Sequence, residues 1–146
     1  MSPSRRGGPW VLDASVVAAA LFQEDHADAC CSLLTSGREL HAPDLVYAEV
    51  GNVIWKRRRR GEIDEDEAAE LLADALRLPL RITPSDALID AALQVALKTD
   101  RTVYDCLYIA LALRERAVMV TGDRRLASAM AGGPLAKHVA WIGAGG

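Results

Sequence analysis

Short apolar runs alternate along the chain with longer segments in which apolar residues recur every three or four positions. Runs of four or five residues that are apolar on both faces are typical of buried strands, and the longer periodic segments are typical of helices. The pattern predicts strands at 9–13, 39–42, 80–83, 118–121 and 139–142, and helices at 14–22, 25–36, 43–60, 64–79, 84–98, 103–116 and 123–130. This alternation predicts an α/β fold with a short, mostly parallel sheet between two helical layers.

Local signals mark two of the predicted helix ends. Gly61 follows the basic end of the 43–60 helix, in the position where glycine commonly ends a helix. Asp64 precedes Glu65, Asp66 and Glu67, and acids are favoured at the cap and in the first turn of a helix.

The chain has 146 residues, the size of one ordinary domain, and 51% of them are hydrophobic. This content supports a real core, so we expect a single domain over 9–146 and a disordered tail over 1–8. Asp13 breaks the apolar segment that follows Arg5 and Arg6, which argues against an export signal. No apolar stretch approaches the ~20 residues of a membrane span.

The three cysteines, Cys30, Cys31 and Cys106, form neither a disulfide framework nor a C-x-x-C pair. We interpret them as reduced, buried thiols of a cytoplasmic protein.

Four carboxylates interrupt stretches that the pattern assigns to the core: Asp13, Glu49, Asp105 and Asp123. A charged group near a core is costly unless it is paired or binds a metal. Asp13 and Asp123 follow predicted strands, and ligands of parallel sheets bind beyond the carboxyl ends of the strands. Glu49 and Asp105 share predicted helix faces with apolar side chains and are expected to point inward. The four acids therefore indicate one acidic cluster that the fold assembles.

Crowded carboxylates repel one another and hold protons more tightly, and a bound divalent cation removes this conflict. Oxygen ligands without cysteine or histidine at ligand spacing suit Mg²⁺ or Mn²⁺. Mg²⁺ usually keeps several waters, which leaves room for a phosphate oxygen and an attacking water. Metal-assisted cleavage of a phosphodiester is the reaction that this set of donors favours. The histidines, His26, His41 and His138, lie in no context that favours a histidine-based ribonuclease mechanism.

Each acid also has a purely structural explanation. Asp13 and Asp123 could cap the helices that follow them, and Asp105 could be a first-turn acid favoured by the helix dipole. Glu49 lies in mid-helix, where its structural explanation would be a buried ion pair. The joint pattern of four acids favours the site.

Four segments of the chain carry a resemblance to a known family: VLDASVVAAALF, APDLVYAEVGNVIWK, TVYDCLYIALAL and VTGDRRLA. In this order they resemble the acidic motifs of PIN-domain ribonucleases, most closely the VapC-type toxins of type II toxin–antitoxin modules. The resemblance extends from Trp10 to Ile142. It implies a PIN-like α/β/α sandwich and a Mg²⁺- or Mn²⁺-dependent endoribonuclease, whose catalytic and metal-binding acids are Asp13, Glu49, Asp105 and Asp123.

The resemblance also implies supporting residues and partners. Ser15 and Thr121 match hydroxyl positions of the family, and Asn52 matches its Glu-x-x-Asn pattern, so all three are expected beside the acids. The implied partners are an RNA substrate, a second copy of the chain in a homodimer, and a cognate antitoxin that blocks the site.

Two groups of basic residues are candidates for contact with RNA. Lys56 and Arg60 project within about 20° of the direction of Glu49 on the same predicted helix. Arg124 and Arg125 follow Asp123 and could hold a phosphate or pair with an acid. The alternative for the run from Lys56 to Arg60 is a solvated helix end whose cations complement the dipole.

The main competing hypothesis is a catalytically silent PIN-like module that binds RNA or protein. The four intact acids argue against it. A receiver-like or haloacid-dehalogenase-like phosphotransfer fold would need paired acids after the first strand, where the chain has Asp13, Ala14 and Ser15. The ribonuclease hypothesis predicts that Asp13→Ala or Asp105→Ala abolishes cleavage and leaves the fold intact, because removal of a crowded acid relieves repulsion.

Overall fold

A computed structural model of the protein describes residues 8–145. Its strands are β1 (Trp10–Leu12), β2 (Leu40–Pro43), β3 (Leu80–Thr83), β4 (Val118–Thr121) and β5 (Val139–Trp141). Its α-helices are α1 (Ala14–Phe22), α2 (Ala27–Leu34), α3 (Leu45–Arg59), α4 (Glu65–Arg77), α5 (Ile89–Thr99), α6 (Val103–Glu115) and α7 (Arg124–Met130). Three 3₁₀ turns complete the described part: η2 (Ser85–Ala87), η3 (Ala136–His138) and η4 (Ile142–Gly145).

The five strands form one sheet in the order β3-β2-β1-β4-β5, and every pair is parallel. Val11 of β1 lies opposite His41 of β2 on one side and Met119 of β4 on the other. Because all strands run the same way, their carboxyl ends share one edge, with β1 at its centre. Loops that leave β1, β2 and β4 therefore emerge side by side.

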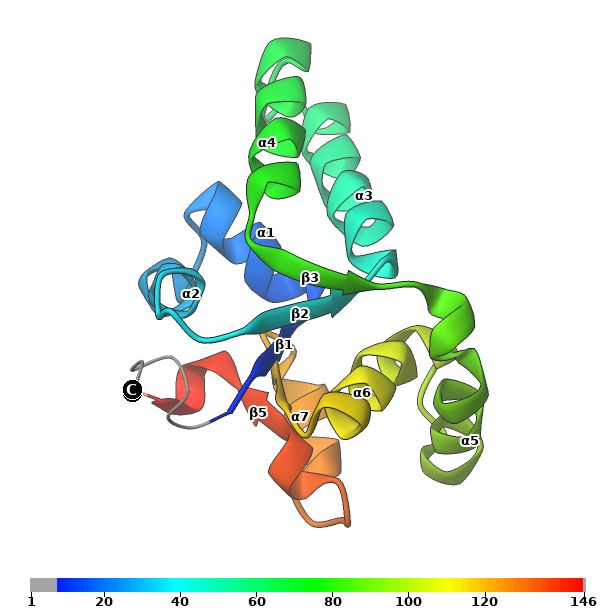
Figure 1. Cartoon of the computed structure of the whole chain (residues 1–146). Coiled ribbons are helices and arrows are strands. Elements are labelled where there is room, and N and C mark those ends of the chain that lie inside the picture. Colours follow the sequence, from blue (N-terminus) through cyan, green and yellow to red (C-terminus); the bar gives the residue numbers. More distant parts are fainter. Residues whose placement is uncertain (1–7, 146) are drawn as a thin grey trace.

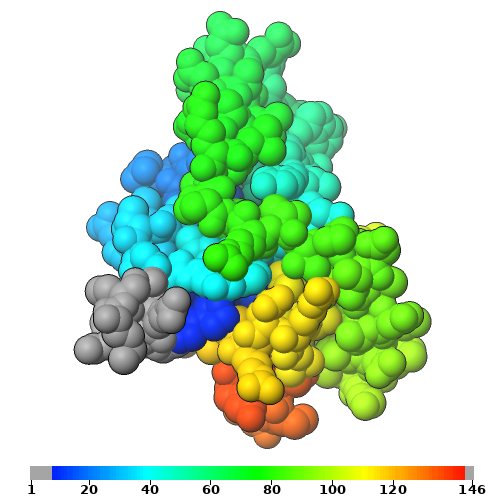
Figure 2. Space-filling view, viewed as in Figure 1, coloured from blue at the N-terminus to red at the C-terminus, as the bar shows by residue number. Residues whose placement is uncertain are grey.

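Helices cover both faces of the sheet, which confirms the predicted three-layer α/β/α sandwich. Figure 1 shows α1–α4 on one side and α5–α7 on the other. Helix α6 packs against β1, β2 and β4, and its residues from Cys106 to Ala112 are all buried. Helices α3 and α4 pack against each other and project beyond the sheet, as Figures 1 and 2 both show.

The predicted helix ends between α3 and α4 are confirmed. Gly61 has φ +75°, in the left-handed region that glycine enters without strain. The Asp64 carboxylate accepts the N–H of Glu67, and the Glu67 carboxylate accepts the N–H of Asp64. This reciprocal capping box fixes the start of α4.

Two predicted helices differ from those observed. The helix expected over 84–98 is divided into η2 and α5, and the buried Leu88 lies at the junction. The helix expected over 25–36 is the shorter α2, which begins only at Ala27 because its N-cap, His26, has a left-handed backbone with φ 67°. A residue in that conformation cannot continue a right-handed helix.

The remaining general expectations have mixed outcomes. All three cysteines are free thiols, but Cys31 is only partly buried, unlike Cys30 and Cys106. No helix within residues 8–145 is long and apolar enough to span a membrane. The predicted tail over 1–8 lies, apart from Gly8, outside the described residues.

Candidate acidic site

Asp13 follows β1 directly and is the N-cap of α1. Its Oδ1 accepts the Val16 N–H at 3.1 Å and the Ser15 hydroxyl, and its Oδ2 accepts the Thr121 hydroxyl. The residue is only 8% exposed. Burial raises the pKa of Asp13 above its usual range, and the hydrogen bonds from Ser15, Thr121 and Val16 oppose that rise. Asp13 is thus a rigidly held carboxylate that binds a proton more tightly than a solvated one.

Two hydroxyl groups tie the loop after β1 to the loop after β4. The fully buried Thr121 donates to Asp13 and accepts the N–H of Asp123 at 2.9 Å. Ser15 donates to Asp13 and accepts the N–H of Gly122 at 2.8 Å. A Cβ on Gly122 would lie 2.9 Å from the Ser15 Oγ, so only glycine allows this approach. Ser15 and Thr121, both predicted beside the acids, do contact Asp13.

Asp123 is exposed at the N-terminus of α7. Its Oδ1 accepts the backbone N–H groups of Arg125 at 3.0 Å and Leu126 at 3.2 Å. Both strand-end acids therefore cap helices, as their structural explanation predicted.

Glu49 lies one turn into α3, half-buried, and meets Tyr108 of α6. The Tyr108 hydroxyl donates to the Glu49 Oε1 at 2.7 Å. Burial raises the pKa of Glu49, the hydrogen bond from Tyr108 lowers it, and the charges of Asp13 and Asp105 raise it. Since Glu49 forms no ion pair within residues 8–145, the ion-pair explanation for this acid is wrong.

Asp105 occupies the first turn of α6, which Thr102 caps by accepting the Asp105 N–H at 3.1 Å. The Arg101 Nη2 lies 3.7 Å from the Asp105 Oδ2. Burial raises the pKa of Asp105, the Arg101 guanidinium lowers it, and the charge of Asp123 raises it. The net shift is upward, so a single partly buried arginine does not neutralise the local negative charge.

The structure brings the four acids to one edge of the sheet. Asp13 and Asp105 both influence the ionisation of Glu49, and Asp123 influences that of Asp105. The side chains do not form a closed set of ligands: among residues 8–145, no three Asp, Glu, His or Cys side chains converge on one metal position. The four carboxylates are thus arranged openly, and three of them, Asp13, Glu49 and Asp105, have raised pKa values. Such an arrangement still fits a hard divalent cation that keeps much of its water.

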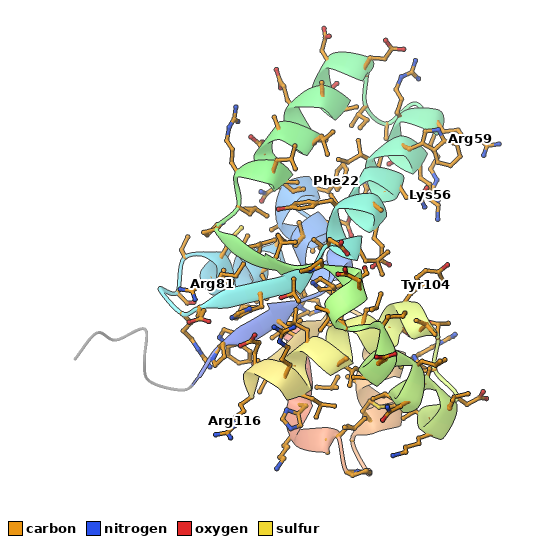
Figure 3. The ribbon with its side chains drawn as sticks, turned by 45° about the vertical axis from the view of Figure 1, so that its right-hand side comes forward. Phe22, Lys56, Arg59, Arg81, Tyr104 and Arg116 are labelled. Carbon is orange, nitrogen blue, oxygen red and sulfur yellow. The ribbon has the colours of Figure 1, made fainter. Side chains whose placement is uncertain are left out.

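The other predicted residues lie around these acids with fewer contacts. Asn52 is exposed on α3, and no hydrogen bond of its side chain is found in the described part of the chain. Lys56 and Arg60 are exposed and form no ion pair within residues 8–145, whereas Arg57 is paired with Glu24 and Glu62. Figure 3 shows Lys56 on α3 and Tyr104 on α6 extending from the same side of the molecule.

Arg124 and Arg125 differ from each other. The Arg124 guanidinium lies over the Trp141 ring, 4.9 Å from its centroid, and pairs with no acid within the described range. Arg125 is exposed.

Sequence reasoning missed Tyr108 and Arg101. Tyr108 is 2% exposed and was assigned to the core, but its hydroxyl is aimed at Glu49. A signal was present: a tyrosine three residues after Asp105 carries a polar atom into an otherwise aliphatic stretch. Arg101 lies four residues before Asp105 but ahead of the Thr102 cap of α6, so the spacing of charges on a helix does not predict their contact.

The PIN domain family model matches residues 10–131. The chain belongs to the PIN-domain family. This PIN domain is 36% identical over 119 residues to ribonuclease VapC3 of Pyrobaculum aerophilum, a match that covers 80% of this chain and 91% of the relative. The crystal structure of PAE2754 from Pyrobaculum aerophilum is similar at a TM-score of 0.69 and 26% identity, covering 96% of this chain and 90% of that one.

A toxin–antitoxin complex from Klebsiella pneumoniae shares the fold at a TM-score of 0.59 and 14% identity, covering 90% of this chain and 96% of that one. These similarities confirm the predicted PIN-like fold and the resemblance to VapC-type proteins.

Proposed function

We propose that the chain is a divalent-metal-dependent endoribonuclease that acts as the toxin of a toxin–antitoxin pair. One observation carries the proposal: four carboxylates from different elements lie along the carboxyl edge of the sheet, close enough to influence one another's ionisation, and three of them have raised pKa values. Groups with perturbed pKa values cluster at functional sites. The 36% identity to a ribonuclease of the VapC type supports RNA as the substrate.

Asp13, Glu49, Asp105 and Asp123 would hold Mg²⁺ or Mn²⁺. When bound, such an ion polarises a phosphate oxygen and lowers the pKa of a coordinated water. The chain supplies orientation: Ser15 and Thr121 fix the Asp13 carboxylate, and Tyr108 fixes that of Glu49. These contacts limit the rearrangement that the carboxylates undergo when they become ligands.

Basic side chains near the acids would bind the phosphate backbone. Lys56 on α3 and Arg60, the C-cap of that helix, follow Glu49 and have no acidic partner within residues 8–145. Arg125 adjoins Asp123. Cations that lack a carboxylate partner are available for phosphates, and their contacts carry affinity without sequence preference.

The proposal includes a cognate antitoxin and a homodimer. Exposed apolar side chains at four-residue spacing follow one face of α5, namely Ile89, Leu93 and Leu97. Trp55, Leu72 and Leu76 are exposed on the projecting α3–α4 pair. Apolar patches of this kind are typical of protein interfaces. Light scattering of the purified chain tests the dimer, and co-purification with the product of the adjacent small gene tests the antitoxin.

The experiment that tests the activity is cleavage of total RNA by the purified chain with Mg²⁺, with Mn²⁺ and with a chelator. We expect cleavage with either ion and none with the chelator. Asp105→Asn should abolish it, whereas Asp90→Asn should not, because Asp90 is also a first-turn helix acid but lies on α5 outside the acidic site. Equal cleavage in chelator would contradict metal dependence. An inert wild-type protein would favour the silent binding module.

A further inference from the structure

A cavity of about 290 Å³ adjoins the acidic site. One wall is shared with that site, because Ser15 holds Asp13, and Gly122 and Arg124 flank Asp123. The opposite wall is the connection between α1 and α2, which contributes Asp25 and His26. The volume is near the lower end of small-molecule sites, which is about 300 Å³. A ligand here would lie next to the loops that hold Asp13 and Asp123.

Flat side chains line the cavity. Trp141 is covered on one face by the Arg124 guanidinium, 4.9 Å from the ring centroid. The His26 ring meets Trp141 edge-on, with centroids 5.5 Å apart and an interplanar angle of 80°. Unstacked bases of single-stranded RNA stack on aromatic rings and on guanidinium planes. The walls therefore carry the surfaces that a nucleobase needs.

The α1–α2 connection holds His26 in an unfavourable backbone conformation. His26 has φ 67° and ψ 15°, a left-handed geometry that disfavours residues with a Cβ. Arg57 of α3 anchors this connection, because its guanidinium pairs with Glu24 and lies 4.5 Å from the centroid of the Phe22 ring. Figure 3 labels Phe22 at the end of α1, beside α3. Backbone strain that the surrounding structure maintains is frequent at ligand sites.

Asp25 gives the cavity its hydrogen-bonding character. The neighbouring Glu24 is neutralised by Arg57, whereas Asp25 forms no hydrogen bond or ion pair within residues 8–145. An ionised carboxylate only accepts hydrogen bonds. Guanine offers two adjacent donors, N1–H and the N2 amino group, to one carboxylate. Uracil offers a single N–H, and the two carbonyl oxygens on either side of it are repelled by a carboxylate.

We propose that this cavity is a nucleobase subsite that holds a guanine of single-stranded RNA beside the scissile phosphate. Asp25 accepts the guanine N1–H and N2–H, and the rings of His26 and Trp141 with the Arg124 plane support the base. As a subsite of the ribonuclease, it rests on the proposed function. It would give the enzyme a base preference that the carboxylates and the phosphate contacts cannot supply.

The first test is cleavage of RNA oligonucleotides that differ only in the nucleotides flanking the mapped cut. The wild type should prefer guanine over uracil at one flanking position by a factor on the order of 10- to 100-fold in kcat/KM, the discrimination of one bidentate contact. Asp25→Asn and His26→Ala should reduce this factor to near unity while cleavage of RNA continues. Asp28→Asn is the matched control, since it removes the same charge from an exposed position outside the cavity, and it should keep the preference.

The second test measures binding without cleavage. In ¹⁵N-resolved NMR spectra, guanosine monophosphate should shift the Gly122 amide and Trp141 indole signals, and uridine monophosphate should shift them much less. If the wild type cuts RNA but both substitutions leave its base preference unchanged, the subsite is wrong and the proposed ribonuclease stands. If no RNA is cut, the ribonuclease proposal fails by itself, and the NMR comparison decides the subsite: equal or absent shifts with the two nucleotides overturn it.

Discussion

Tyr108 donates its phenolic hydrogen to the Glu49 carboxylate across 2.7 Å, joining helices from opposite faces of the sheet. The two residues are 59 positions apart in the chain. Tyr108 is buried, and its own pKa is raised by burial first and by Glu49 second, so it stays a donor at any physiological pH. Glu49, in contrast, is a half-buried acid whose pKa is raised first by burial and further by the charges of Asp13 and Asp105. Tyr108 therefore favours the ionised form of Glu49, which is the form that a cation binds.

Tyr108→Phe should weaken metal-dependent cleavage more at mildly acidic than at neutral pH. Loss of the hydrogen bond raises the pKa of Glu49 further, so a larger fraction is protonated as the pH falls. The acidic limb of the pH–rate profile should move to higher pH, and the protein should lose about 1 kcal/mol of stability. Tyr104→Phe is the matched control, because Tyr104 lies on the same helix with 64% exposure. Identical profiles for all three proteins would exclude this role of Tyr108.

Thr121→Val tests the buried hydroxyl that joins Asp13 to Asp123. Valine has nearly the same shape, but it leaves the Asp13 Oδ2 without its donor and the Asp123 N–H without its acceptor. A buried polar group without a partner costs about 1–3 kcal/mol, and we expect a loss of that size in urea unfolding. Thr35→Val should cost less, because Thr35 is exposed and bonds only to backbone carbonyls. Equal losses in the two variants would show that Thr121 acts through shape alone.

The contacts of Asp13 change one expectation drawn from the sequence, that either Asp13→Ala or Asp105→Ala would leave the fold intact. Asp13→Ala removes an N-cap, worth about 0.5–2 kcal/mol, and leaves the buried Thr121 hydroxyl without its acceptor. It should therefore destabilise the protein. Asp105→Asn should be neutral or slightly stabilising at neutral pH, since the net effect of the fold is to raise the pKa of Asp105. Urea unfolding of both variants checks this, and a strongly destabilised Asp105→Asn would contradict it.

The sequence predicted the order of the elements because the signals that carry it are local. Strands 80–83 and 118–121 were predicted with the observed bounds, since Pro79 and Pro84 flank the first and Gly122 follows the second. The shortened α2 was not predicted, because no glycine or proline marks the left-handed backbone of His26, and the ring contact of this residue is with Trp141, 115 positions away. The same limit applies to the break before α5, where the buried Leu88 ends one element and precedes the next.

The candidate site was predicted only as far as residue type reveals it. Four acids in apolar stretches are visible in the sequence, and Ser15 and Thr121 came from the resemblance to PIN domains. The partner of Glu49 was missed, because Tyr108 has the pattern of a core residue and only its polar hydroxyl distinguishes it from the aliphatic side chains around it. Arg124 was expected to face a phosphate or an acid, and its position over Trp141 depends on how α7 packs against β5.

Mg²⁺ should stabilise the folded protein at neutral pH and have little effect in acid. The folded pKa values of Asp13, Glu49 and Asp105 are raised above their ordinary values of 3.8, 4.5 and 3.8. Stability from these groups is therefore fully present below those ordinary values and is lost as the pH rises through the raised ones. A cation that binds the ionised acids reverses this loss, by about 2.7 kcal/mol at 100 times its Kd. Thermal unfolding with Mg²⁺, against sodium chloride of equal ionic strength, measures the effect. Asp105→Asn should reduce the stabilisation by Mg²⁺. An equal stabilisation at acidic pH would contradict the prediction.

The salt dependence of RNA binding tests whether Lys56 and Arg60 contact phosphates. Each lost phosphate contact should reduce the slope of log K against log salt by about 0.7 for single strands, and should weaken binding similarly for all sequences. We expect this of Lys56→Ala and Arg60→Ala, measured with the cleavage-deficient Asp105→Asn protein so that the RNA stays intact. Arg116→Ala is the control, since Figure 3 shows Arg116 on the side of the molecule away from Lys56. If the control changes the slope as much as the other two, binding reflects overall charge and not a path for RNA along α3.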